Sequence, residues 1–164
     1  MLKLAELNVL SHEEFVSVVG PIFEHSPWIA ARSCDRRPFP TREHLHRTMC
    51  ETVASATEGE KIALIRAHPD LVGRETLTRE SESEQASAGL GDLRADEVGL
   101  FDTYNRQYQE RFGFPFVICA RLNKKEAILD AFPQRLGHSR AKEIETALQE
   151  IYKIADLRLR DLVQ

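Results

Sequence analysis

The last part of the chain carries the pattern that most constrains its fold. From Ser139 to Val163, apolar residues recur at intervals of three and four, the period of one face of an α-helix. The stripe consists of Ile144, Leu148, Ile151, Ala155 and Leu162. A helix with one apolar stripe is stabilised mainly by packing that stripe against other elements. The pattern therefore predicts one long helix that the rest of the chain must cover.

Helix start and stop signals account for much of the preceding sequence. A capping residue followed by an apolar run with a period of 3.6 predicts a helix, and glycine or proline predicts its end. The first predicted helix follows the capping box Ser11-x-x-Glu14 and ends at Gly20-Pro21, and the second runs from Trp28 to about Cys34 after the N-cap Ser26-Pro27. A longer helix follows Thr41 and ends at Gly59, and the next helix ends near Ala67. A short helix follows the capping box Ser81-x-x-Glu84 and stops at Gly89 or Gly91, and the last of this series is Asp96–Phe112.

The stretch FGFPFVICARL, residues 112–122, is typical of a buried strand and of a buried helix start alike. No other segment is a strand candidate with which it could pair. The chain has 164 residues, of which 42% are hydrophobic, which suits one core. We therefore expect residues 1–164 to form a single all-α domain, a helical bundle of about eight helices without a β-sheet.

Charge and composition exclude several classes of partner. The net charge is −4, and the 22 basic residues are scattered instead of forming a stripe that could follow phosphates, so nucleic acid is a poor candidate. No apolar run approaches the roughly 18 residues of a membrane span, and the start turns acidic too early for a signal peptide. Cys34, Cys50 and Cys119 lack the spacing of a disulfide framework or zinc site. These features predict a cytoplasmic protein with reduced thiols.

The stretch RAHPDL places His68 at a predicted helix end, directly before Pro69. The residue fits two interpretations: a partly exposed imidazole favoured by the helix dipole, or a general acid or base held in place by the proline. A nucleophilic pair of Cys119 with His68 is a further option, although a thiol within FVICA is typical of packing. The pattern leaves these readings open.

Two further features are open in the same way. Ser81 and Glu84 are typical of a helix cap, yet free amides beside the Ser81 hydroxyl, with Glu84 and Gln85, would also suit a carboxylate or carbonyl. Arg158 falls on the apolar stripe of the last helix, where an unpaired charge would cost several kcal/mol. Its partner would be Glu84, a carbonyl or an anionic ligand, unless the guanidinium reaches out to solvent.

No pattern predicts a metal or a cofactor. His44 and His46 are two residues apart and point to different helix faces, and His12 lacks the second histidine of a zinc motif. Neither a glycine-rich phosphate loop nor a GxGxxG fingerprint is present. Any catalysis would therefore rest on side chains alone.

In combination, these segments closely resemble the 2-oxo-4-hydroxy-4-carboxy-5-ureidoimidazoline (OHCU) decarboxylase family. The likeness rests on AHPDL, LTRESESEQASAGL, FGFPFVICAR, RLG and EIETALQEIYKIADLRL in this order, and on the start LNVLSHEEFVSVVGPIFEHSPWIA. The resemblance implies an all-helical homodimer and a carboxy-lyase without cofactor. Its substrate would be a small ureidoimidazoline, converted to (S)-allantoin and CO2 in the third step of urate degradation.

The resemblance also implies roles for particular residues. His68 matches the family's catalytic proton donor, Glu84 a second acidic participant, and Arg158 an arginine at the floor of the pocket. The residues implied to contact substrate are Pro69, Ser81, Glu82, Ser83, Glu84, Gln85, Phe116, Val117, Ile118, Cys119 and Ala120. Two positions depart from the family pattern: the connection 72–75 is shorter than expected, and His138 stands where asparagine is commoner.

Two other classes of protein compete with this reading. The triplet HPD is also the signature of J-domain cochaperones, but the helix before it has only Lys61 and Arg66 as basic residues, whereas that class needs a positive face. The second rival is a catalytically silent helical scaffold in which Arg158 forms an internal salt bridge with Glu84. Binding of allantoin would separate an enzyme from both rivals.

Overall fold

The computed structural model describes residues 1–73 and 75–164. Within these residues the chain forms nine α-helices, two short 3-10 helices and no β-sheet, so the predicted all-α class is confirmed. The chain divides into two compact units, Met1–Ala67 with Tyr152–Gln164 (unit 1) and His68–Ile151 (unit 2). A single domain over 1–164 remains a prediction.

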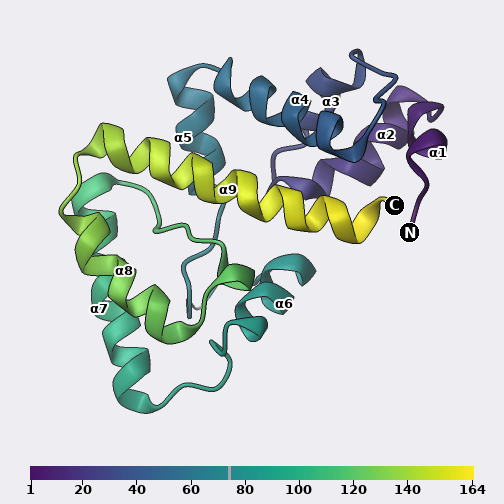
Figure 1. Ribbon diagram of the computed structural model, residues 1–164. Helices are drawn as coiled ribbons and strands as arrows, with labels where there is room; N and C mark the ends of the chain where they lie inside the picture. The colour runs from purple at the N-terminus through teal and green to yellow at the C-terminus, as the bar shows by residue number, and fades with distance from the viewer. Residues whose placement is uncertain (74) are drawn as a thin grey trace. The chain divides into compact units, whose positions relative to one another are not determined.

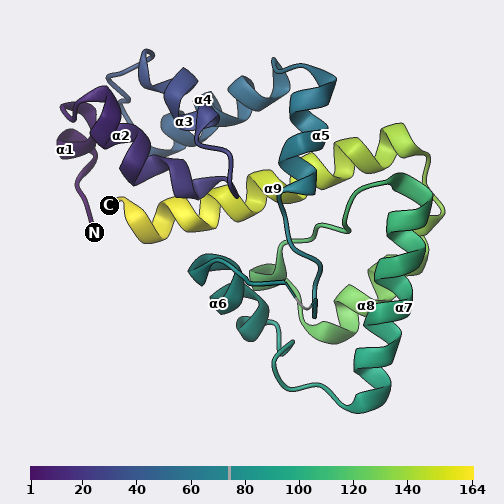
Figure 2. The same cartoon turned by 180° about the vertical axis from the view of Figure 1, so that it is seen from behind.

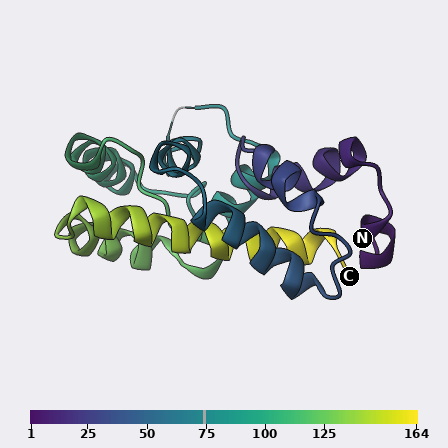
Figure 3. The ribbon, with the colours of Figure 1, turned by 90° about the horizontal axis from the view of Figure 1, so that it is seen from above.

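Unit 1 contains both ends of the chain. The N- and C-termini lie side by side (Figures 1 and 3), because the Leu2 amide donates to the Leu162 carbonyl at 3.0 Å and the Gln164 amide donates to the Leu2 carbonyl at 2.9 Å. Within this unit α2 packs against α3, and α3 against α4. Its elements are α1 (Leu4–Asn8), α2 (His12–Val19), η1 (Gly20–Ile22), α3 (Trp28–Cys34), α4 (Arg42–Ala54), α5 (Glu58–Arg66) and the final part of α9 (Arg140–Leu162).

The capping box at the start of α2 is confirmed. The Ser11 hydroxyl accepts from the Glu14 amide at 3.1 Å, and the Glu14 carboxylate accepts from the Ser11 amide at 2.9 Å. Thr41 likewise caps α4. The prediction that Gly59 ends α4 is wrong: α4 ends at Ala54, and Gly59 lies inside α5. A capping box of Thr57 with Glu60 starts α5 immediately before this glycine and offsets its low helix propensity.

Helix α3 has the predicted range but not the predicted cap. Pro27 is the N-cap residue, and the Ser26 hydroxyl donates to the Glu24 carbonyl at 2.9 Å instead of accepting from the helix. His25 lies between Glu24 and Ser26 and has a φ of +45°, in the left-handed region that non-glycine residues seldom adopt. The Ser26 side chain therefore stabilises the turn before α3 and does not cap the helix.

Unit 2 packs its helices around an aromatic core. Helices α7 and α8 lie side by side (Figures 1 and 2), and Phe132 of α8 stacks on Tyr104 of α7 at 5.1 Å between ring centroids. Helix α6 packs against η2. The sequence patterns did not predict α8. The elements of this unit are α6 (Arg79–Ser87), α7 (Ala95–Phe112), η2 (Ala120–Leu122), α8 (Lys125–Leu136) and the first part of α9.

Residues 113–119, between α7 and η2, form neither a helix nor a strand. Both readings of this stretch are therefore wrong, apart from the short 3-10 turn that Ala120 opens. The segment is nevertheless deeply buried: Phe116 is 1% exposed and packs against Phe132 at 3.9 Å between centroids, and Tyr108 lies edge-on to it at 5.4 Å. Irregular backbone in a core must find hydrogen bonds outside itself.

The long helix at the end of the chain is confirmed as α9, Arg140–Leu162. Leu148, Ile151 and Ala155 of the predicted stripe are buried, whereas Ile144 and Leu162 are half-buried. Neither α9 nor another helix in residues 1–73 and 75–164 is long and apolar enough to cross a membrane.

Candidate active site

His68 follows the end of α5 and is buried. The helix closes at its C-cap residue Ala67, whose amide donates to the carbonyls of Ala63 and Leu64 at 3.0 and 3.2 Å. The imidazole comes next and is only 7% exposed, so the reading as a partly exposed helix end is wrong. His68 therefore remains a candidate general acid or base, the second of the two interpretations of the sequence.

The backbone after His68 turns sharply. The Gly73 amide donates to the Asp70 carbonyl at 3.3 Å, and Val72 has a φ of +59°. A side chain at residue 73 would meet the Asp70 carbonyl and Cβ at 3.1 Å, a tight approach that would push the turn apart by a few tenths of an ångström, so glycine suits this position. Burial, followed by the charges of Glu75 and Asp102, raises the pKa of the Asp70 carboxyl. The predicted shortening of the connection 72–75 involves Arg74, which lies outside the described residues.

Residues 81–85 lie on α6, but Ser81 does not start it. Thr78 is the N-cap residue, and its hydroxyl accepts from the Ser81 amide at 3.2 Å, so the predicted capping box of Ser81 with Glu84 is wrong. Thr78 precedes Ser81 by one helical turn, which shifts the helix start upstream. The Ser81 amide is consequently occupied, which removes it from the predicted set of free amides.

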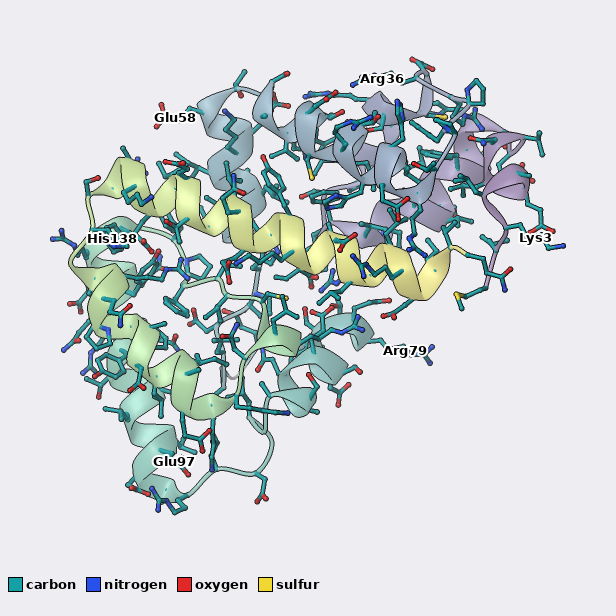
Figure 4. All side chains as sticks on the ribbon, viewed as in Figure 1. Lys3, Arg36, Glu58, Arg79, Glu97 and His138 are labelled. Carbon is teal, nitrogen blue, oxygen red and sulfur yellow. The ribbon has the colours of Figure 1, made fainter. Side chains whose placement is uncertain are left out.

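The helix presents these five residues on different faces. Ser81 and Gln85, four residues apart, are buried at 6% and 8% exposure, and Glu84 is half-buried. Glu82 and Ser83 are exposed. At the start of the helix, Arg79 points away from α6 (Figure 4). The buried face therefore offers one hydroxyl and one amide, with the Glu84 carboxylate at its border.

The Gln85 amide contacts the turn that follows His68. Its Oε1 accepts from the Val72 amide at 3.2 Å, and its Nε2 lies 3.4 Å from the Asp70 carbonyl. Gln85 was predicted as a substrate contact on the resemblance. In this structure both ends of its amide lie on the backbone beside the catalytic candidate.

The buried segment 116–120 is held by two charged side chains. The Glu150 carboxylate accepts from the Cys119 amide at 3.2 Å, and the Arg135 guanidinium donates to the Val117 carbonyl. The same guanidinium lies 4.2 Å from the Phe116 ring centroid. These contacts supply the hydrogen bonds that the irregular backbone lacks.

Cys119 itself is a packing residue by its environment. It is 1% exposed, and burial is the first cause that raises the pKa of its thiol. A nucleophilic cysteine requires a lowered pKa and access. Both conditions fail here, which weighs against a Cys119–His68 nucleophile pair.

Arg135 belongs to a buried network centred on Glu143. The Glu143 carboxylate accepts from Arg135 Nε at 2.7 Å and from the Tyr108 hydroxyl at 2.6 Å, and lies 2.8 Å from His138 Nδ1. Burial, followed by the hydrogen bond to Glu143, raises the pKa of Tyr108. His138 lies at the connection of α8 to α9 (Figure 4), so the histidine that departs from the family pattern here serves as a partner of a core carboxylate.

Arg158 is buried in unit 1 and paired there. Its Nη1 donates to the Glu24 carboxylate at 2.9 Å and to the Pro21 carbonyl at 3.3 Å. The two side chains of this ion pair are 4% and 2% exposed. The alternative in which the guanidinium reaches solvent is therefore wrong, and a carbonyl partner is confirmed. Glu24 was missed, because nothing in the local sequence marks a carboxylate whose partner is 134 residues away.

The chemistry available at these positions is acid–base and hydrogen bonding. The described residues contain no group of three or more histidine, cysteine or acidic side chains able to hold a metal ion. Unit 2 contains the His68 imidazole and the Glu84 carboxylate, two groups of the kind that give or take a proton, whereas the Arg158 guanidinium belongs to unit 1. Such an inventory suits a reaction in which a proton is placed on a defined carbon atom.

Comparison with known proteins identifies the protein family to which the chain belongs. Residues 8–160 match the OHCU decarboxylase family, and the chain belongs to that family. It is 42% identical to the 2-oxo-4-hydroxy-4-carboxy-5-ureidoimidazoline decarboxylase of Halalkalicoccus jeotgali over 98% of this chain and 92% of the relative. The protein of the same name from Amia calva is also 42% identical, over 98% of this chain and 94% of the relative.

A solved structure supports the same relationship. The crystal structure of (S)-allantoin synthase superposes with a TM-score of 0.83 at 26% identity, covering 100% of this chain and 54% of that one. A J-domain reading of HPD would explain three residues, whereas the family match covers nearly the whole chain.

Proposed function

We propose that this protein decarboxylates 2-oxo-4-hydroxy-4-carboxy-5-ureidoimidazoline to (S)-allantoin and CO2 in urate degradation, without a cofactor. The observation that carries this proposal is the 42% identity, over nearly the full chain, to proteins named for this reaction. The buried His68, in a segment that matches the family, supports it further.

The substrate explains why side chains suffice. Its carboxylate leaves from a carbon that also bears a hydroxyl and that neighbours a ring carbon doubly bonded to nitrogen. When the bond to the carboxylate breaks, its electron pair moves toward that C=N group, so the acceptor is built into the substrate. The ring nitrogen and the neighbouring carbon each take up a proton, and the hydroxyl gives up its own proton as its carbon becomes the carbonyl of allantoin. The protein must orient the carboxylate and deliver the proton to one face.

Each proposed role follows from the chemistry of the residue. His68 delivers the proton, since an imidazole titrates close to neutral pH and this one is buried. Glu84 orients the imidazole or the substrate hydroxyl. Arg158 and the backbone near Phe116 bind carbonyl or ureido oxygens. The Ser81 amide drops out of this set because it donates to Thr78.

We further propose that the protein is a cytoplasmic homodimer and that residues 1–164 form one domain. Its partner is a small-molecule substrate and neither nucleic acid nor a membrane. Light scattering during gel filtration should give a mass twice the 18.7 kDa of one chain. A mass of 18.7 kDa at micromolar concentration would exclude the dimer.

The activity is tested by generating the unstable substrate from urate with urate oxidase and the hydrolase. With the protein present, circular dichroism should show fast formation of (S)-allantoin, whereas spontaneous decay gives no excess of one enantiomer. His68→Asn and Glu84→Gln should lower the rate by about 100-fold or more, in line with the loss of a general acid or base.

The matched control is Glu80→Gln, which makes the same change of charge at an exposed position of α6. The assignments are wrong if folded His68→Asn or Glu84→Gln forms (S)-allantoin at the original rate. Unchanged activity in Arg158→Ala would make that arginine purely structural.

A further inference from the structure

The turn after His68-Pro69 adopts a conformation that its sequence does not favour. The turn runs from Asp70 to Gly73, and its third residue, Val72, has a φ of +59°. Type II turns place glycine or asparagine at this position, and a β-branched residue there is an outlier. Contacts from elsewhere must therefore hold the turn.

Two side-chain amides hold three successive backbone groups of this turn. Asn105 Nδ2, from α7, donates to the Leu71 carbonyl at 2.8 Å. Gln85, from α6, contacts the groups on either side, the Asp70 carbonyl and the Val72 amide. Both amide side chains are buried, with 8% of each residue exposed, so water competes weakly for these bonds. We call Asn105 and Gln85 the amide clamp.

The clamp acts on the backbone close to His68. On one side of the imidazole, the Ala67 amide is bonded to the last turn of α5. On the other side, the ring of Pro69 fixes its φ, and the clamped turn begins at the next residue. Pro69 and the clamped turn therefore restrict the backbone on the C-terminal side of His68.

Asn105 also leaves one of its own buried polar atoms unsatisfied, which costs stability. Among the described residues its Oδ1 is buried without a hydrogen-bond partner. An apolar side chain of similar size would remove that unsatisfied atom. The asparagine at this position is therefore better explained by its contact with Leu71 than by packing.

We propose that Asn105 and Gln85 are positioning residues that hold His68 in its reactive place through the Asp70–Gly73 turn. This inference rests on the proposed function, in which His68 delivers the proton. Neither residue needs to touch the reacting atoms. Displacement of a catalytic group by about 1 Å can reduce a rate by about 100-fold.

The first test is Asn105→Leu, which has similar volume and no donor. Its kcat should fall at least tenfold with a KM within about twofold of the original, because binding groups stay in place while His68 moves. Asn105→Asp keeps the shape, removes the donor, and gives the same test where the leucine variant does not fold. An unchanged kcat in the folded variant overturns the proposal.

A matched control exists in unit 1. The Asn8 amide clamps the Phe39 backbone in the same way, with Nδ2 donating to the carbonyl at 2.9 Å and Oδ1 accepting from the amide at 2.8 Å. Asn8→Leu should lower stability without lowering kcat more than twofold. An equal fall in kcat for Asn8→Leu and Asn105→Leu would mean that the clamp acts only through stability, and would overturn the positioning role.

Gln85 separates positioning from substrate contact. Gln85→Met removes both contacts with the turn, so positioning predicts a lower kcat at little-changed KM. A raised KM at unchanged kcat would identify a substrate contact alone and overturn the role of Gln85 in the clamp.

A readout without substrate keeps this inference separate from the proposed function. The His68 ring signal in NMR spectra, assigned with His68→Asn, should change its chemical shift in Asn105→Leu and not in Asn8→Leu. If the protein forms no (S)-allantoin yet this signal responds, the proposed function fails and the positioning stands. If the protein is active and neither kcat nor the signal responds, the positioning fails.

Discussion

The buried pair of Arg158 with Glu24 shows how a charge is accommodated on an apolar helix stripe. Each charge lost its hydration on folding, and the pair makes up for that loss only while both partners are present. The pair also places an arginine implied in substrate binding in a defined position, since its Nη1 is bonded to a carboxylate and a carbonyl at once.

Removal of Glu24 should therefore lower the stability of the folded state. We expect Glu24→Ala to lower the free energy of unfolding by about 3–5 kcal/mol, because the buried Arg158 charge would lose the carboxylate that neutralises it. Urea denaturation measures this change. Replacing both residues, as in Glu24→Leu with Arg158→Met, should recover much of the loss.

The control for this prediction is the pair of the exposed Arg160 with the half-buried Asp156 on the same helix. Arg160→Ala should change the free energy of unfolding by no more than about 1 kcal/mol. A similarly small loss in Glu24→Ala would show that Arg158 finds other compensation in the folded state.

A second prediction at this scale concerns alkaline pH. Burial, followed by the charges of Asp156 and Glu51, raises the pKa of Cys50 from 9.0 to about 12, and burial with the nearby Cys50 raises the pKa of Tyr152 from 10.0 to about 12. Both groups hold their protons more tightly in the folded state, so their contribution to stability is complete below pH 9.

That contribution is lost as the pH rises from 9 through 12. The free energy of unfolding, measured in urea at pH 8, 9, 10 and 11, should fall over the last three points. The fall should be shallower in Cys50→Ala, because the alanine variant has no thiol to ionise on unfolding. Parallel curves for the two proteins would contradict the shift assigned to Cys50.

At the scale of elements, caps decided which helices the sequence could predict. Helices α2 and α4 begin at Ser11 and Thr41, whose side chains accept from the helix, and both were predicted. Helices α1 and α8 begin at Lys3 and Lys124 without a side-chain cap bond and were missed, and α8 also contains Pro133. Helix α7 lacks such a bond as well, yet its periodicity over 18 residues was sufficient.

The start of α6 gives a prediction at this scale. Thr78→Ala should lower the free energy of unfolding by about 1 kcal/mol, the usual contribution of an N-cap residue, since the Ser81 amide would lose its acceptor. Hydrogen exchange should show faster exchange in the first turn of α6. Faster exchange in Ser81→Ala and unchanged exchange in Thr78→Ala would restore Ser81 as the cap.

At the scale of the whole molecule, local patterns found the candidate residues but not what positions them. His68, Arg158 and the segments 81–85 and 116–120 stand in motifs that are readable along the chain. The residues that hold these segments in place do not stand in such motifs. Asn105 contacts a carbonyl 34 residues away, and Arg135 contacts one 18 residues away. Such contacts exist only after folding, so a single sequence carries no local signal for them.

The irregular segment 113–119 was misread for the same reason. Its composition suits a strand or a helix, but the bonds that satisfy its backbone come from Arg135 and Glu150 on two other helices. Tertiary contacts therefore overruled the local propensity of this segment.

Binding of the product tests the whole molecule at once. A ligand that binds only the folded state stabilises it by about 2.7 kcal/mol at 100 times its Kd. For a protein of this size, such a gain should raise Tm by about 5 to 10 °C. We therefore expect (S)-allantoin to raise Tm by this amount at saturation, measured by differential scanning fluorimetry.

The comparison with (R)-allantoin makes this measurement specific. The two enantiomers share composition, charge and solubility, so non-specific stabilisation would be equal for both. A site that delivers a proton to one face of the ring has to distinguish them, and the shift should be smaller for the (R) form. Equal shifts would leave the stereochemical outcome without a binding basis, whereas no shift with either enantiomer is the result expected of a silent helical scaffold.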